Sequence, residues 1–118
     1  MAILHGGTSD IVNVIPPGGA VDRSKITATP LLKTPSLDVI RLDVPAGKDT
    51  ANHTTPGDLT VLCLEGAVDV TAGGRTRRLA AGQLLYLAAG TLHSLRGIED
   101  AAVLLTVVRS ESGGRDVG

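Results

Sequence analysis

Hydrophobic and polar residues alternate along this chain with the two-residue period of β-strands, and glycine and proline interrupt the pattern at short intervals. The stretch DVIRLDV, residues 38–44, places Ile40, Leu42 and Val44 on one face and Arg41 and Asp43 on the other. This pattern predicts a half-buried strand. The runs LTVLCL (59–64) and AAVLLTVV (101–108) are apolar on both faces, which predicts central strands covered on both sides.

A hairpin is predicted for AVDVTAGGRTRRL, residues 67–79, because Gly73 and Gly74 supply the positive φ angles of a tight antiparallel turn. Two further apolar segments, IVNVI (11–15) and PLLKT (30–34), lie near the N-terminus. Helical patterns are scarce. Many short strands joined by glycine turns predict an all-β fold that is closed or sandwich-like, since closure removes exposed strand edges.

The chain has 118 residues, 42% of them hydrophobic, which predicts one domain with a core of its own. We expect an N-terminal arm with strands over residues 1–36, a barrel over 37–109 and a polar, glycine-rich tail over 110–118. No internal repeat or linker divides the barrel region.

Charge and composition exclude several function classes. There are 11 basic and 12 acidic residues and a single aromatic side chain, Tyr86, so neither a basic face nor stacking rings are available for nucleic acid. No apolar run approaches a membrane span, and residues 1–10, MAILHGGTSD, lack the basic start and apolar stretch expected of a secretion signal. The single cysteine, Cys63, excludes an internal disulfide and fits a reducing compartment. We therefore expect a cytoplasmic protein.

Residues 45–97 resemble the cupins, small jelly-roll barrels (double-stranded β-helices) that carry two conserved motifs. The residues that match the first motif at its spacing are Gly47, His53 and Gly66. The residues that match the second motif are Gly82, Gly90 and His93. The resemblance implies a small single-domain bacterial cupin of the jelly-roll fold, with both histidines pointing into the mouth of the barrel.

The match is incomplete at the positions where metal-binding cupins hold an ion. The resemblance implies a second histidine and a glutamate in the first motif, but Thr55 and Leu59 stand there. His53 and His93 remain, and stable metal sites normally have three or four protein ligands. Asp58 supplies a third if the Pro56-Gly57 step reverses the strand alternation; otherwise it faces solvent. A divalent ion (Zn, Ni, Mn or Fe) is expected to be weakly held, if bound at all.

Two other side chains are candidates for the pocket. Cys63 lies in an apolar strand, where a free cysteine usually packs as a small hydrophobe. Tyr86 either lines the pocket or packs at its rim. The basic run RTRR, residues 75–78, predicts alternating side chains on a hairpin that are solvated.

Three functions fit this pattern. The first is a module that binds a small organic molecule, neutral or anionic, with the two histidines as polar anchors. The second is a metal-dependent oxygenase or isomerase, and the third is a degenerate structural barrel. The first is the hypothesis we prefer, because two metal ligands are missing while both histidines are retained. We also expect a homodimer in which the apolar segments 11–15 and 30–34 pack against, or are exchanged with, a partner barrel.

Overall fold

The computed structural model describes residues 6–15 and 21–109. Within them the chain forms eight β-strands and no helix, as predicted. None of the described residues belongs to a helix long and apolar enough to cross a membrane. The strands, in chain order, are β1 (Thr27–Lys33), β2 (Leu37–Val44), β3 (Leu59–Glu65), β4 (Ala67–Ala72), β5 (Arg75–Ala80), β6 (Leu84–Leu87), β7 (His93–Gly97) and β8 (Ala101–Val108).

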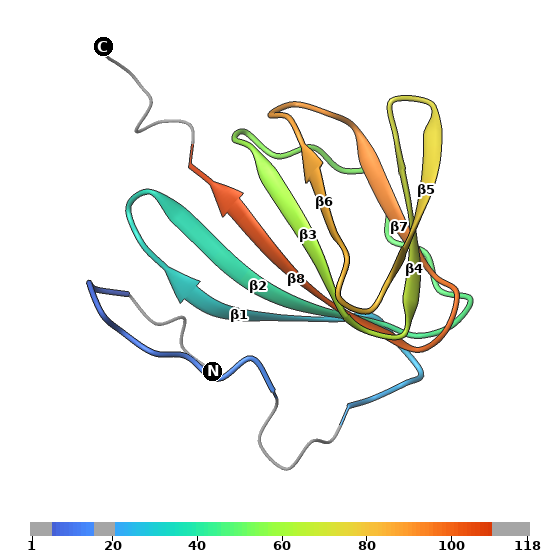
Figure 1. The fold of residues 1–118 in the computed structure, drawn as a ribbon, viewed down its shortest axis with the longest axis horizontal. Coiled ribbons are helices and arrows are strands. Elements are labelled where there is room, and N and C mark those ends of the chain that lie inside the picture. Colours follow the sequence, from blue (N-terminus) through green and yellow to red (C-terminus); the bar gives the residue numbers. More distant parts are fainter. Residues whose placement is uncertain (1–5, 16–20, 110–118) are drawn as a thin grey trace.

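The strands form two antiparallel sheets that face each other (Figure 1). One sheet has five strands in the order β1-β2-β8-β3-β6, and the other has three in the order β5-β4-β7. Aliphatic side chains from both sheets meet between them, and we call this side of each sheet its inner face. The largest fully buried side chains are Leu59, Val44, Val61, Val68, Val70, Val103 and Cys63. Burial of each such aliphatic chain contributes about 1.5–3 kcal/mol to folding.

Both runs predicted as central strands lie inside the five-stranded sheet. β8 is hydrogen-bonded to β2 and β3, and β3 is hydrogen-bonded to β8 and β6. Along β3, Leu59, Val61 and Cys63 are buried on the inner face, whereas the residues between them are only partly covered. The alternation therefore runs unbroken from the first residue of β3.

The predicted hairpin joins β4 to β5. Gly73 and Gly74 have φ angles of 58° and 77°, the left-handed conformation expected of both central residues of this turn. The register pairs Ala72 with Arg75 next to the turn. This pairing register determines which of the four residues 75–78 lie on the inner face of the sheet.

The second face of β2 is not solvated, which corrects the prediction of a half-buried strand. Arg41 and Asp43 are only 4% and 5% exposed. The Arg41 guanidinium donates to the Asp43 carboxylate, with an Nη2–Oδ1 distance of 2.9 Å, and to the carbonyl oxygen of Val14 at 2.8 Å. Strand period alone could not predict this burial, because the cover comes from residues far away in the sequence.

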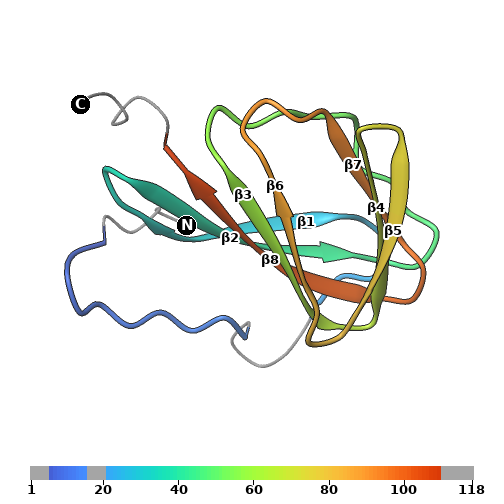
Figure 2. The same ribbon diagram turned by 45° about the horizontal axis from the view of Figure 1, so that its top comes forward.

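Residues 6–15, which we call the N-terminal segment, supply that cover. This segment lies outside the two sheets (Figure 2, dark blue) and is tied to β1 by a hydrogen bond from the Gly6 N–H to the Lys33 carbonyl. Contrary to the prediction of a strand over 11–15, these residues form no strand, and the chain bends at Val14 and Ile15.

β1 contains most of the second predicted N-terminal segment and pairs with β2 of its own chain. Residues 27–33 therefore belong to the five-stranded sheet rather than to a separate arm. The remainder of the predicted arm, residues 1–5 and 16–20, and the predicted tail over 110–118 lie outside the described residues.

Candidate functional site

The two motif histidines meet at one end of the barrel, which we call the barrel mouth. The mouth is formed by the β4–β5 turn, the β6–β7 connection and the segment that precedes β3, all at the top of the barrel in Figure 1. His53 and His93 form an isolated antiparallel bridge with reciprocal backbone hydrogen bonds of 2.8 and 2.9 Å. A further hydrogen bond, from the Gly90 N–H to the Thr55 carbonyl, joins the same two segments. The backbone thus fixes one histidine beside the other.

His93 is the buried member of the pair. Its side chain begins β7 on the inner face and is 6% exposed. The ring Nδ1 lies 2.9 Å from the carbonyl oxygen of Thr91. Because a carbonyl only accepts hydrogen bonds, Nδ1 carries the proton in the neutral ring and Nε2 is left with a free lone pair. His93 therefore presents a hydrogen-bond acceptor of fixed orientation.

His53 is exposed and packs on His93 edge to face. The ring centroids are 5.8 Å apart and the planes are inclined by 78°. Near neutral pH histidine readily accepts or donates a proton. The pair therefore combines a fixed acceptor with a solvent-exposed imidazole.

A hollow of about 420 Å³ lies next to the segments that carry this pair, although neither histidine lines it. It is lined by Asn52, Thr71, Ala72, Gly73, Gly74, Thr91 and Leu92. Asn52 and Leu92 directly precede the two histidines, and Ala72 is paired with His93. The volume lies in the range of small-molecule sites. A second hollow of about 380 Å³ at the β1–β2 turn contains none of the predicted site residues.

Asp58 does not join the histidines. The β3 alternation continues without reversal, so Asp58 is exposed on the outer side, where its carboxylate accepts a hydrogen bond from the Ala89 N–H at 3.0 Å. Tyr86 also lies on the outer side and is 59% exposed. Partial desolvation and the neighbouring Asp58 carboxylate raise the pKa of the Tyr86 hydroxyl. Asp58 therefore faces solvent, the alternative predicted for an unbroken alternation, and Tyr86 does not line the hollow at the mouth.

Cys63 lies in the centre of the core rather than at the mouth. It is fully buried, and its thiol lies 3.4 Å from the Glu65 carbonyl oxygen. Burial in apolar surroundings raises the pKa of this thiol. The side chain therefore packs as a small hydrophobe and does not line the mouth.

Residues 40–109 match the cupin domain. The chain belongs to the cupin family. No curated protein sequence matches this cupin. Among solved structures, it is similar to a conserved protein of unknown function from Streptococcus pyogenes, with a TM-score of 0.74, 24% identity and coverage of 92% of this chain and 95% of that one. A cupin superfamily protein from Desulfitobacterium hafniense has a TM-score of 0.74 at 14% identity, with 84% and 98% covered.

Another similar structure is the salicylate 1,2-dioxygenase of Pseudoaminobacter salicylatoxidans in its adducts with gentisate, with a TM-score of 0.66 and 20% identity. The match covers 70% of this cupin but only 24% of the dioxygenase. A protein described as an RmlC-like cupin with a double-stranded β-helix fold, from Methanocaldococcus jannaschii, has a TM-score of 0.70 at 11% identity, with 87% and 93% covered. Together these likenesses establish the jelly-roll fold and leave the activity open.

In this chain, two positions that hold metal ligands in the cupin motif carry side chains with structural roles. Leu59, at the glutamate position, is 1% exposed and packs in the core. Thr55, at the second histidine position, is buried and its hydroxyl donates to the Gly57 carbonyl at 2.9 Å. Within residues 6–15 and 21–109, no group of three His, Cys, Asp or Glu side chains is placed to hold an ion. Two imidazoles alone do not make a closed metal site.

Sequence reasoning missed several residues of the mouth. Thr91 acts through its backbone carbonyl, which leaves no trace in side-chain patterns. Arg75 and Arg77 are exposed, as predicted for this run, but they also share strand parity with Leu79, which is buried. That shared parity was the available signal that both arginines lie on the inner face.

Proposed function

We propose that this cupin binds a small organic molecule at the barrel mouth, with His53 and His93 as its polar anchors. The observation that carries the proposal is the pairing of one oriented, buried imidazole with one exposed imidazole beside a hollow. A ligand site typically combines an apolar surface with a few polar groups of fixed direction.

Each part of the mouth has a separate role in this proposal. The Nε2 atom of His93 accepts a hydrogen bond from the ligand, because the Thr91 carbonyl holds the proton on Nδ1. His53 remains in contact with solvent, where its ring nitrogens can donate or accept a hydrogen bond to the ligand. Ala72 and Leu92 supply apolar contact surface within the hollow.

The orientation of His93 also favours a second candidate, the weak binding of a divalent transition metal. Histidines that bind metals usually donate their second ring nitrogen to a carbonyl or carboxylate, as His93 does to Thr91. His53 and His93 would hold the ion, and the remaining ligands would come from water or from the bound molecule. We therefore expect such an ion to exchange freely.

Ligand-observed NMR with a library of small fragments tests the main proposal. We expect fragment binding to the wild type to be lost in both His53→Ala and His93→Ala, because the two rings act on one ligand. His5→Ala is the matched control, since it removes the third histidine of the chain. Fragments that bind the two mouth variants as well as the wild type would contradict a histidine site.

Calorimetric titration of zinc, nickel and manganese into metal-stripped protein tests the second candidate. We expect weak binding by the wild type and none by His53→Ala or His93→Ala, since removing one donor destroys the chelate. Affinity should also fall as the solution is acidified, because protons compete for the imidazole lone pairs. Equal heats for the wild type and both variants with every ion would exclude the metal.

A further inference from the structure

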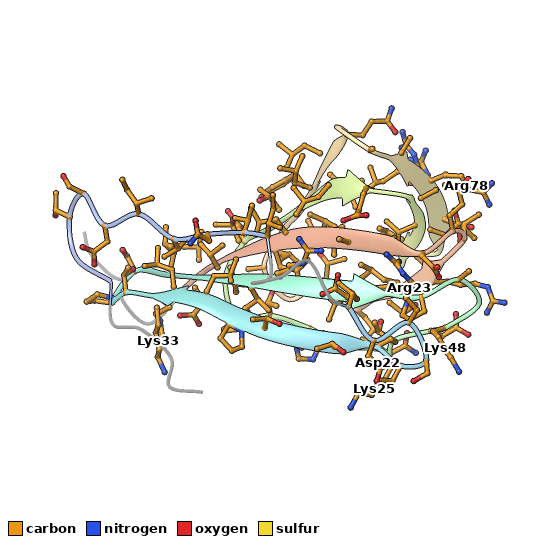
Figure 3. The ribbon with its side chains drawn as sticks, turned by 90° about the horizontal axis from the view of Figure 1, so that it is seen from below. Asp22, Arg23, Lys25, Lys33, Lys48 and Arg78 are labelled. Carbon is orange, nitrogen blue, oxygen red and sulfur yellow. The ribbon has the colours of Figure 1, made fainter. Side chains whose placement is uncertain are left out.

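The basic run on β5 is divided between the two faces of the three-stranded sheet. Arg78 lies on the outer face, where its guanidinium binds the Asp69 carboxylate with an Nε–Oδ1 distance of 2.8 Å, and Figure 3 shows it at the surface. Arg75 and Arg77 have the opposite parity and therefore share the inner face with Leu79, which is 5% exposed. Because β5 is an edge strand, both inner-face arginines are still exposed.

Arg75 lies in one row with the two histidines. Ala72 is paired with Arg75 on one side and with His93 on the other, and His93 is bridged to His53. Side chains of directly paired residues project from the same face of a sheet. Two strand spacings separate the Arg75 and His93 backbones, a distance of about 10 Å. The intervening residue is an alanine, whose short side chain packs against the core and also lines the hollow at the mouth.

The charge of this row is not compensated. The carboxylates of Asp69 and Asp49 are bound by Arg78 and Arg96, respectively, in ion pairs of 2.8 and 2.7 Å. Neither Arg75 nor Arg77 forms an ion pair with any described residue, and the inner face of β5, β4 and β7 carries no acidic residue. A site with uncompensated positive charge and a hydrogen-bond acceptor selects ligands that carry an anionic group and a donor.

From this placement we infer that the ligand of the barrel mouth is a small carboxylate, bound by Arg75 and Arg77 while a polar hydrogen of the ligand contacts the histidine pair. This inference rests on the proposed function and names its ligand class. Arg75 contacts the carboxylate at the mouth, and Arg77, the next inner-face residue along β5, adds to the attraction. Guanidinium groups bind carboxylates through paired charge-assisted hydrogen bonds.

The test uses pairs of fragments in which a carboxylate is compared with its primary amide, for example succinate with succinamide. Binding is followed by the ring signals of His53 and His93 in isotope-labelled full-length protein. We expect succinate, but not succinamide, to shift these signals. Arg75→Gln should weaken succinate binding at least about tenfold, the loss typical of a charge-assisted hydrogen bond, and the double variant with Arg77→Gln should weaken it further.

Arg78→Gln is the matched control, because it removes the same charge from the same strand on the outer face. If Arg78→Gln weakens succinate binding as much as Arg75→Gln, the effect is general electrostatics and the inference is wrong. The inference also fails if amides bind as well as carboxylates, or if Arg75→Gln and Arg77→Gln leave carboxylate binding unchanged. Binding of the amides that still depends on the histidines would leave the proposed function standing. Charged residues on an edge strand can also prevent two sheets from associating. If Arg75→Gln and Arg77→Gln change only the association state and not succinate binding, the arginines have that role and the inference is wrong.

If no fragment of either kind shifts the histidine signals, the inference and the proposed function fail together. Loss of amide binding in His53→Ala and His93→Ala, with no preference for carboxylates, removes the inference alone.

Discussion

At the scale of single residues, the orientation of His93 depends on the backbone rather than on another side chain. The Thr91 carbonyl lies only two residues away and accepts from Nδ1. A change in the β6–β7 connection that moved this carbonyl would free the ring to rotate and would change which ring nitrogen is protonated. The chemistry of the mouth is therefore set by the conformation of the β6–β7 connection as much as by the histidines themselves.

Cys63 provides a direct test of where the core ends and the mouth begins. Because its thiol is fully buried and burial raises its pKa, we expect almost no reaction with a disulfide-exchange reagent in the native protein at pH 7. One thiol per chain should react at once in denaturant. Fast labelling of the native protein, followed by absorbance, would place Cys63 at an accessible site and contradict the packed core.

The ion pair between Asp69 and Arg78 predicts a dependence of stability on pH. The hydrogen bonds from Arg78 lower the pKa of the Asp69 carboxyl below its unfolded value. The pair therefore stabilises the fold fully above the unfolded pKa of about 3.9, and this contribution is lost as pH falls through the lower folded pKa. The stability difference between wild type and Asp69→Asn, measured by urea unfolding, should shrink as pH is lowered from 6 toward the acid limit of folding. A difference that grows on acidification would contradict the assignment.

At the scale of elements, the turns differ in what they require of glycine. Gly66, between β3 and β4, has a φ of 74°, and a Cβ there would overlap the carbonyl oxygen of Asp100. Gly82 has a similar φ of 89°, but no atom lies within 4 Å of its Cβ position. The first turn therefore needs glycine for both conformation and space, and the second for conformation alone.

Substitution by valine separates these two costs. Gly82→Val should destabilise the fold by about 1–3 kcal/mol, the usual cost of a strained backbone conformation. Gly66→Val should cost more, because the backbone at Asp100 must also move. Unfolding of both variants by urea, followed by circular dichroism, measures the difference. Equal losses, or no loss at Gly66, would show that the β3–β4 turn is wrongly placed.

Most of the strand arrangement followed from local patterns, whereas its exceptions depend on distant contacts. The central strands β3 and β8 and the hairpin at Gly73-Gly74 were predictable from two-sided apolar runs and turn chemistry. The burial of Arg41 was not, because its cover lies 27 residues earlier in the chain. The same limit applies to the site: the motif predicted that the histidines meet, but the row through Ala72 to Arg75 depends on strand register.

At the scale of the whole molecule, the outer face of the five-stranded sheet combines covered and uncovered apolar surface. Val12 and Val14 of the N-terminal segment are half-buried, whereas Ile11 and Ile15 are 92% and 70% exposed. The buried Arg41 holds the segment through the Val14 carbonyl. No backbone–backbone hydrogen bond joins residues 11–15 to the rest of the described chain, so backbone groups of this segment remain open to pairing.

The sequence of the open segment is self-complementary. Residues 11–15 read IVNVI in both directions. Two copies paired antiparallel about Asn13 would therefore place Ile11 of one chain opposite Ile15 of the other, as a two-fold interface requires. Pairing of two such edges satisfies open backbone groups and covers both isoleucines. The homodimer expected from the sequence stays a prediction, and we propose that its two-fold axis passes near Asn13.

Light scattering after size exclusion tests this assembly. The wild type should have the mass of a dimer at micromolar concentration, and the double variant Ile11→Asp, Ile15→Asp should have the mass of a monomer, because four carboxylates would meet across the axis. Leu92→Asp is the matched control: this residue is also a prominent exposed hydrophobe, at 55%, but it lies at the barrel mouth. The control should remain a dimer with an unchanged melting temperature. A wild type that is already monomeric, or a double variant that still pairs, would show that the N-terminal segment is not the interface.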